Sequence, residues 1–225
     1  MFNSMEIGRI AGIPIYLDMM FVLVLLFFTY PYFIAGSTQA VSAGFVIIIG
    51  ILVSILLHEL GHTFAGRLFR AHVSHIDLTG LGGVAHFERT LPRSVLARTV
   101  IYLAGPAVNL GLWFAFDALA WQAAFGGLAM LATPLFVLKW VNQVLLVFNL
   151  LPAYPLDGGL TLDAWLGRLL GPVWSVRIIA GLGLACSAWL AYISLPTNFY
   201  LLFVALFLAM ANWQKLQGLG RWQRW

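Results

Sequence analysis

The sequence predicts an all-α polytopic membrane protein with about six transmembrane helices, and with a short membrane-associated β-hairpin or loop after the second helix. Two observations indicate this fold class. The 225-residue chain is 62% hydrophobic and only 9% charged, whereas soluble domains are nearer half apolar and a quarter charged. Apolar stretches of roughly 20 residues, long enough to cross a bilayer, also recur along the chain with short connections between them.

The expected spans are almost free of charge, and they cover residues 17–35, 41–64, 95–119, 128–151, 173–195 and 199–213. Between the second and third spans, residues 76–87 alternate weakly in polarity and include several glycines. This segment is expected to form a strand or hairpin at the membrane edge, with a plain cytoplasmic loop as the alternative. The chain is therefore expected to be one integral-membrane domain over residues 1–225, without a PDZ or CBS domain.

Basic residues indicate the orientation. Of the 12 Lys and Arg residues, all except Lys139 fall on one side of the membrane if six spans alternate. The positive-inside rule makes that side cytoplasmic, so both termini are expected there. The N-terminus does not have the pattern of a cleavable signal peptide, and a prokaryotic plasma membrane is the expected location. The net charge of +4 is small and scattered, which argues against a nucleic-acid partner.

A motif with metal-binding spacing ends the second apolar stretch, where residues 58–62 read His-Glu-Leu-Gly-His. His58 and His62 are four residues apart and share one face of a helix, so both can bind one metal ion. Glu59 lies beside them and can activate a water molecule. Because such groups are costly in hydrocarbon, an intramembrane cluster of them indicates a functional site at the cytoplasmic end of the span. The alternative is a buried polar cluster without metal.

A third ligand is expected at Asp157, at a similar depth. Asp157 follows Pro152 and Pro155, which interrupt regular helix after the fourth span. Irregular backbone at membrane depth is tolerated only against protein or water, so Asp157 is expected to face a polar cavity. Taken alone, this segment is better explained as an ordinary interfacial turn, whereas its match in depth with His58–His62 favours a metal ligand.

Together these residues resemble the site-2 protease family of intramembrane zinc metalloproteases. The family pattern is His-Glu-x-x-His on one span and Asn-x-x-Pro-x-x-Pro-x-Asp-Gly on a later one, here His58–His62 and Asn149–Gly158. The glycine-containing segment 76–85 and the run Gly105-Pro106-Ala107-Val108-Asn109 are also similar to the family. The resemblance covers nearly the whole chain.

The resemblance implies a zinc metalloendopeptidase that cleaves a membrane-protein substrate within or near its transmembrane segment. One zinc ion would be bound by His58, His62 and Asp157. Glu59 would be the catalytic base, taking a proton from the attacking water and passing it to the leaving amine. The partners implied are a transmembrane substrate and the lipid bilayer.

Four further residues are candidates for substrate or oxyanion binding. Asn149 can donate a side-chain amide hydrogen bond, although a structural bond to nearby freed backbone is the alternative. Gly82 and Gly83 lie in the segment that could bind an unwound substrate by strand addition. Asn109 is a weaker candidate, because helix packing through Gly105 is a sufficient explanation for that region.

Three more histidines and three rival functions bear on this interpretation. His72, His75 and His86 are expected at the membrane interface rather than as metal ligands. A metal transporter would need polar ligands along a path through both leaflets. The outer halves of the predicted spans are nearly free of charge, with Asp117 as the main exception, which argues against this function. A proteolytically inactive relative that binds membrane partners is a second alternative, although the intact motif residues argue against it. A metalloenzyme that acts on lipid is the third.

Overall fold

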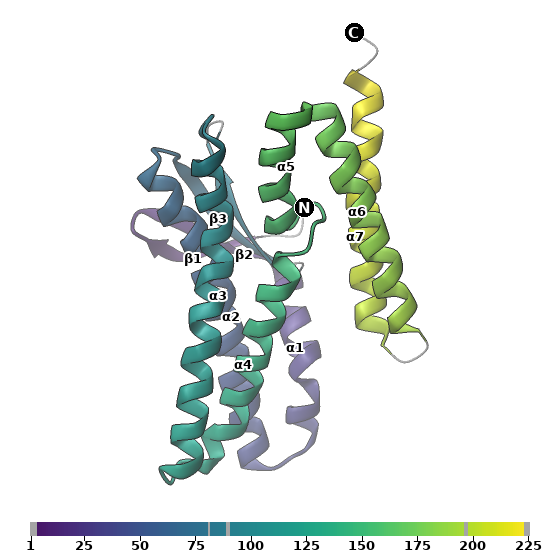
Figure 1. The fold of residues 1–225 in the computed structure, drawn as a ribbon. Coiled ribbons are helices and arrows are strands. Elements are labelled where there is room, and N and C mark those ends of the chain that lie inside the picture. The colour runs from purple at the N-terminus through teal and green to yellow at the C-terminus, as the bar shows by residue number, and fades with distance from the viewer. Residues whose placement is uncertain (1–3, 81, 89–90, 196–197, 223–225) are drawn as a thin grey trace. The chain divides into compact units, whose positions relative to one another are not determined.

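The computed structural model describes residues 4–222 except 81, 89–90 and 196–197, and these residues form four strands and seven helices (Figure 1). In chain order the elements are β1 (Met5–Ile10), β2 (Ile13–Leu17), α1 (Met19–Ile34), α2 (Thr38–Leu68), β3 (Val73–Thr79), β4 (Gly82–Phe87), α3 (Val95–Phe125), α4 (Ala129–Asn149), α5 (Asp157–Leu170), α6 (Pro172–Ser194) and α7 (Phe199–Trp222).

The chain divides into two compact units. The first unit comprises Met1–Pro92 and Ala104–Leu146, and the second comprises Arg93–Leu103 and Val147–Trp225. Helix α3 therefore begins in the second unit and continues in the first. A single metalloprotease domain over residues 1–225 stays a prediction.

The first unit contains a four-stranded sheet in the order β1-β2-β3-β4. Strands β3 and β4 form an antiparallel hairpin in which Thr79 pairs with Gly82, so a hairpin after the second predicted span is confirmed. Strands β1 and β2 were not predicted. They form a second hairpin, and β2 joins β3 in parallel through the pair Ile15–Ile76. This pairing joins residues far apart in the chain, which local polarity patterns do not report.

One face of the sheet packs against helices α1 and α2. Ile76 and Leu78 of β3 are fully buried there, in a cluster with Phe21 and Leu25 of α1 and Leu60 of α2. Leu60 lies between the two histidines of the predicted motif. The sheet therefore anchors the end of α2 that carries the motif.

Helices α3 and α4 of the first unit carry an ion pair between Asp117 and Lys139. The Lys139 Nζ atom lies 2.7 Å from Asp117 Oδ1. Both residues lie within predicted spans, Asp117 in 95–119 and Lys139 in 128–151. Because an isolated charge is costly at membrane depth, their pairing accounts for both.

In the second unit, the interrupted segment before Asp157 leads into a helix that was not predicted. Helix α5 begins at Asp157 and is 14 residues long, too short to cross a bilayer. Helices α6 and α7 follow and lie side by side (Figure 1). A Cβ atom at Gly183 of α6 would lie 2.2 Å from Asn212 Oδ1 of α7, so glycine is required for this close packing.

Four helices of the described chain are long and apolar enough to cross a membrane, namely α2, α3, α4 and α6. They match four of the six predicted spans. Helix α1 has only 16 residues, which is short for a crossing, and α7 is not among the four. The chain is thus an integral membrane protein with four apolar helical spans, while six crossings and the orientation of the termini stay predictions.

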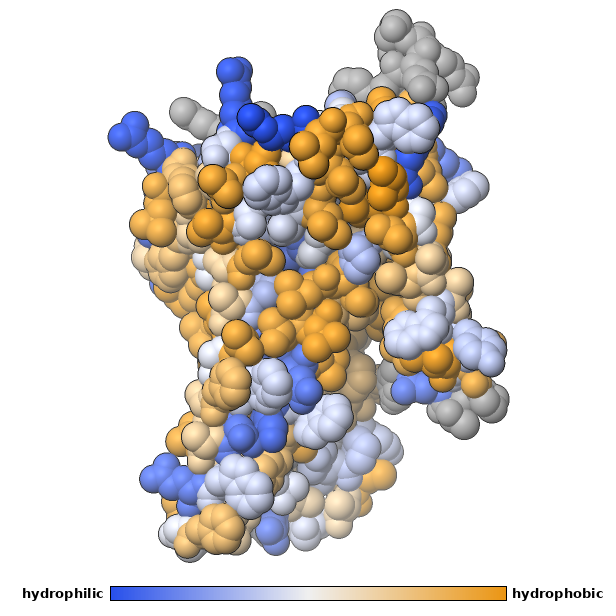
Figure 2. Space-filling view, viewed as in Figure 1, coloured by the Kyte–Doolittle hydropathy of each residue, from blue (hydrophilic) through white to orange (hydrophobic). Residues whose placement is uncertain are grey.

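The helix surfaces agree with this assignment. Figure 2 shows hydrophobic side chains over much of the visible helical surface, with hydrophilic side chains in separate clusters. Large apolar side chains such as Phe45 on α2, Phe114 on α3 and Trp189 on α6 are more than half exposed. Exposure of so much apolar surface is typical of helices that face lipid rather than water.

Candidate metal centre

The last third of α2 positions the three residues of the His-Glu motif. His58, Glu59 and His62 are 6%, 5% and 7% exposed, so all three are buried. The Nε2 atoms of His58 and His62 lie 3.0 Å apart, and their rings are nearly perpendicular with centroids 4.7 Å apart. The one-turn spacing of the histidines thus brings two ring nitrogens to one point, as predicted from the sequence.

A glycine allows α3 to approach these rings closely. A Cβ atom at Gly105 would lie 2.3 Å from His62 Nε2 and 2.7 Å from His58 Cε1. On the same contact between helices, a Cβ atom at Gly61 would lie 2.8 Å from the Ala104 carbonyl oxygen. Any side chain at Gly105 would occupy the space at the two ring nitrogens.

A chain of buried polar side chains extends from His58 through the first unit. Asn109 Oδ1 is hydrogen-bonded to His58 Nδ1, and Asn109 Nδ2 donates to Asn142 Oδ1 at 3.0 Å. Asn142 Nδ2 donates in turn to Ser54 Oγ and to the Leu138 carbonyl, each at 2.9 Å. Asn109, Asn142 and Ser54 are completely buried. Asn142 was not singled out from the sequence, where it is one more polar residue in an apolar helix.

This network fixes the tautomer of His58. Because Asn109 donates through its amide nitrogen to Asn142, its oxygen is left to accept from His58 Nδ1–H. The Nε2 atom of His58 then carries the lone pair, and it faces His62. Such hydrogen bonds from the other ring nitrogen orient metal-binding histidines in proteins.

Strand β4 passes beside Glu59. A Cβ atom at Gly83 would lie 2.4 Å from Glu59 Cγ and 2.6 Å from Glu59 Oε1. Two of the predicted substrate-binding residues, Gly82 and Gly83, therefore lie in the strand next to the predicted base. Only a residue without a side chain fits at Gly83.

The histidines fit a zinc ion. A tetrahedral zinc with Zn–N bonds of about 2.0–2.1 Å holds two imidazole nitrogens about 3.4 Å apart, close to the 3.0 Å between His58 Nε2 and His62 Nε2. Imidazole nitrogen and carboxylate oxygen are also donors found together at catalytic zinc sites. His58, His62 and an acidic third ligand are thus a suitable donor set.

The predicted third ligand belongs to the second unit. Asp157 is the first residue of α5 and is buried, and Asn149 is the last residue of α4 and half-buried. Cβ atoms at Gly158 and Gly159 would lie 2.2 Å from the Leu150 carbonyl oxygen and 2.4 Å from that of Ala153. The two glycines let the start of α5 fold tightly against the segment before it, and this fixes the backbone at Asp157.

A second buried asparagine holds that segment. Asn212 of α7 accepts a hydrogen bond from the Tyr154 backbone nitrogen at 3.0 Å and donates to the Tyr154 carbonyl at 2.9 Å. The Tyr154–Pro155 peptide bond is cis. Asn212 was also missed from the sequence, because its partner lies 58 residues away.

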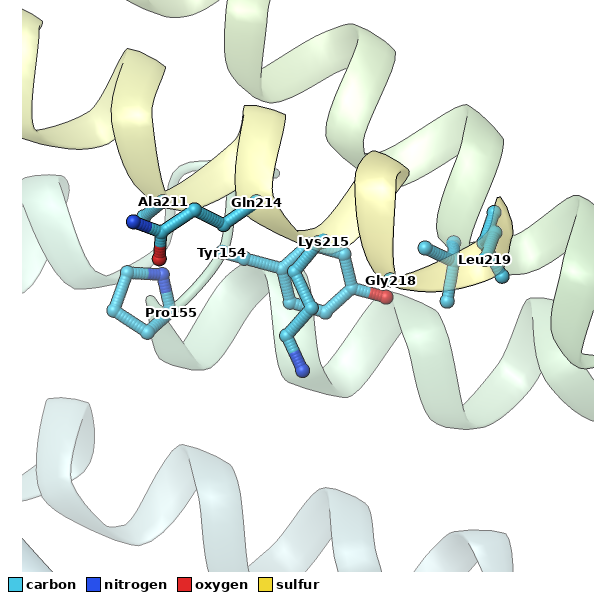
Figure 3. A pocket seen from close by; sticks show the side chains of 8 residues that line it. Tyr154, Pro155, Ala211, Gln214, Lys215, Gly218 and Leu219 are labelled. Atoms are coloured by element: carbon cyan, nitrogen blue, oxygen red, sulfur yellow. The ribbon is translucent and has the colours of Figure 1, made fainter. Parts of the chain in front are cut away.

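A cavity of about 520 Å³ lies beside this anchor in the second unit. Figure 3 shows Lys215 of α7 close to the Tyr154 ring, and the Lys215 Nζ atom is 5.0 Å from the ring centroid. The residues that line the cavity do not include any of the predicted site residues. The cavity is therefore a feature of the α7 anchor rather than of the predicted metal centre.

Comparisons with known proteins agree with the geometry. Residues 46–126 match peptidase family M50. The chain is 32% identical over 209 residues to the zinc metalloprotease MJ0392 of Methanocaldococcus jannaschii, covering 91% of this chain and 58% of that protein. It is 32% identical over 110 residues to stage IV sporulation protein FB of Bacillus subtilis, covering 48% of this chain and 36% of that protein.

The structural comparison covers more of both chains. The solved structure of the site-2 protease from Methanocaldococcus jannaschii matches with a TM-score of 0.69 and 27% identity, over 95% of each chain. The chain spans about half the length of the first curated relatives that it matches. On these findings, the chain belongs to peptidase family M50, the family of the site-2 proteases.

Proposed function

We propose that this protein is an intramembrane zinc metalloprotease that hydrolyses a peptide bond within or near the transmembrane segment of a membrane-protein substrate. One observation carries the proposal. The Nε2 atoms of His58 and His62 converge at 3.0 Å in a buried site, next to a buried Glu59. Burying three such groups at the end of an apolar helix costs free energy, so their presence there indicates a functional site.

The proposed zinc ligands are His58, His62 and Asp157. The two histidines are supported by their convergence and by the bond that orients His58 through Asn109. Asp157 is supported by its burial and by its place in the family motif at the start of α5. When bound, zinc would act as a Lewis acid toward the scissile carbonyl and the attacking water.

Glu59 is the proposed proton carrier. Its carboxylate would take a proton from the water as the water oxygen bonds to the carbonyl carbon. It would then deliver that proton to the amide nitrogen as the C–N bond breaks, so that a carboxylate and an amine leave. Burial of Glu59 keeps bulk water from competing for the proton.

Strand β4 is the proposed docking element for the substrate. A substrate helix must unwind before its peptide bonds are accessible, and an unwound segment can pair with an exposed strand edge. β4 lies at one edge of the sheet, and its Gly83 lies against Glu59. A substrate paired along Gly82 and Gly83 would pass next to the base. Asn149 is proposed to donate a hydrogen bond to the substrate near Asp157.

The orientation belongs to the same proposal. The distribution of basic residues supports a site near the cytoplasmic face of a prokaryotic plasma membrane, with both termini in the cytoplasm.

The test uses purified protein in detergent with a panel of single-span membrane proteins as substrates. Wild type, Glu59→Gln and the control Glu88→Gln, which alters an exposed acid outside the site, are compared for cleavage and bound zinc. We expect cleavage by wild type and the control only, with equal zinc at the His58–His62 site in all three. Cleavage by Glu59→Gln at the wild-type rate would overturn the role of Glu59. Absence of zinc from folded wild-type protein would overturn the metal centre.

A further inference from the structure

A second group of metal-ligating side chains lies on the sheet of the first unit, outside the centre described above. His75 and Asp77 are two residues apart in β3, so their side chains point to the same face of the sheet. His86 of β4 pairs with His75 across the strands, which brings it to that face as well. The intervening residue Ile76 points to the opposite face and is fully buried.

The donor atoms of these three side chains converge. The Nε2 atoms of His75 and His86 lie 3.5 Å and 3.0 Å from Asp77 Oδ2. One ligand atom from each residue lies within 4.8 Å of the other two. The imidazole rings are stacked, with centroids 4.3 Å apart and planes 12° apart, and the Nε2 atom of each ring lies next to the Asp77 carboxylate.

Ser74 orients the His75 ring. The Ser74 hydroxyl donates its one hydrogen to the His86 carbonyl at 3.0 Å, and it lies 2.9 Å from His75 Nδ1. The Ser74 oxygen can then accept a hydrogen bond from His75 Nδ1–H. In that tautomer the Nε2 lone pair of His75 is directed at the Asp77 carboxylate. Two electron-rich atoms facing each other are stabilised by a cation between them.

The kind of cation follows from the donors. Two imidazoles and one carboxylate suit zinc and neighbouring transition metals, whereas calcium and magnesium prefer oxygen ligands alone. The side chains of His75, Asp77 and His86 are 34%, 28% and 44% exposed, so an ion can enter from solvent. Three protein ligands leave room for water in the remaining coordination positions.

We propose that His75, Asp77 and His86 form a second binding site for a divalent transition-metal ion, separate from the His58–His62 centre. A bound ion would join β3 to β4 across their His75–His86 pair. Because the ligands are partly exposed, the site would exchange its metal with the surroundings more readily than the buried centre does. The proposal concerns binding alone and does not depend on the proposed proteolysis.

The test measures bound zinc in the purified full chain after equilibrium dialysis at micromolar free zinc. The variants are His75→Ala/His86→Ala, His58→Ala/His62→Ala and the control His72→Ala, which removes an exposed histidine just before β3 that is not in the cluster. We expect the first double variant to bind one equivalent less than wild type and to keep its buried zinc. His58→Ala/His62→Ala should keep the exchangeable equivalent, and His72→Ala should match wild type.

A spectroscopic measurement separates metal binding from loss of fold. Cobalt(II) in place of zinc should give wild type and His58→Ala/His62→Ala a visible absorption band that His75→Ala/His86→Ala reduces. All variants should have the same circular dichroism in chelator, because the altered side chains are on the partly exposed face. Equal metal content and equal cobalt spectra in wild type and His75→Ala/His86→Ala would overturn the proposal, and the cluster would then be a proton-mediated His–Asp interaction only.

Discussion

The first unit carries two histidine clusters that differ in how the fold assembles them. His58 and His62 come from one helix, one turn apart, and are buried at 6% and 7% exposure. His75 and His86 come from two strands and meet through cross-strand pairing, with side chains 34% and 44% exposed. The helix cluster is thus local in sequence and buried, whereas the sheet cluster is non-local and partly exposed.

Burial determines how many hydrogen-bond partners each cluster needs within the protein. A buried polar group must be hydrogen-bonded, and His58 is supported by a chain that continues through Asn109 and Asn142 to Ser54. At the open cluster a single hydroxyl, Ser74, orients His75, and water can satisfy other groups. Substitutions should therefore be far more damaging at the buried cluster than at the exposed one.

The largest expected effect is at Glu59. Glu59→Gln removes the proposed proton carrier, so we expect proteolysis to fall by about 10²–10⁴-fold, the range of general acid–base catalysis. Zinc at the His58–His62 centre should be unchanged, because Gln has the same shape. The cleavage rate and metal content of Glu88→Gln, at an exposed position, should match wild type. A loss of zinc in Glu59→Gln would contradict the assignment of Glu59 as a base.

The next effect concerns the space at the two ring nitrogens. Gly105→Ala would place a Cβ atom 2.3 Å from His62 Nε2, so we expect most of the buried zinc to be lost. Gly111→Ala on the same helix is the matched control, because a Cβ atom there meets no atom within 4 Å. Alanine favours helix over glycine by roughly 1 kcal/mol at either position. Equal zinc content in the two variants, measured by mass spectrometry, would disprove the steric argument.

A smaller effect is expected from the bond that orients His58. Asn109→Ala should weaken zinc binding at the buried centre by about 10–100-fold, as found for such partners of metal-binding histidines. Asn109→Asp retains an oxygen that can accept from His58 Nδ1 and should restore part of the affinity. Titration with a zinc-selective chelator measures both values. If Asn109→Ala binds zinc as wild type does, Asn109 has only a packing role.

The smallest effect is expected at Ser74. Ser74→Ala removes the acceptor for His75 Nδ1 at the exposed cluster, but water can replace it, so metal affinity there should fall only about threefold. Zinc at the buried centre should be unaffected. Cobalt titration of this variant compares directly with Asn109→Ala. A larger loss for Ser74→Ala than for Asn109→Ala would reverse the comparison between the two clusters.

Much of the buried cluster could be predicted from the sequence because its geometry is local. The His58–His62 spacing on a helix brings their ring nitrogens together without reference to the rest of the chain. The hairpin β3–β4 was predicted from its glycines and alternation, and four expected spans match helices that can cross a membrane. The roles of Glu59 and Asp157 stay predictions that rest on these residues and on the family.

Other features depend on residues far apart in the sequence. The β1–β2 hairpin beside β3, the hydrogen bonds of Asn142, and the anchor from Asn212 to Tyr154 each join distant segments. A single polar residue in an apolar helix does not reveal its partner, so Asn142 and Asn212 went unnoticed. The pairing of His75 with His86 across β3 and β4 is likewise not evident from their spacing in the sequence.

Hydropathy and one-turn spacing are properties of short segments, so the membrane class, four of the spans and the helical His-Glu motif could be predicted without the structure. The folded chain was needed to show that Asn109 orients His58, that glycines allow α3 and β4 to approach the site closely, and that His75, Asp77 and His86 share one face of a sheet. Strand register and helix approach are set by packing between segments. A local sequence pattern indicates which surface of a segment is buried, but it does not indicate which other segment covers that surface.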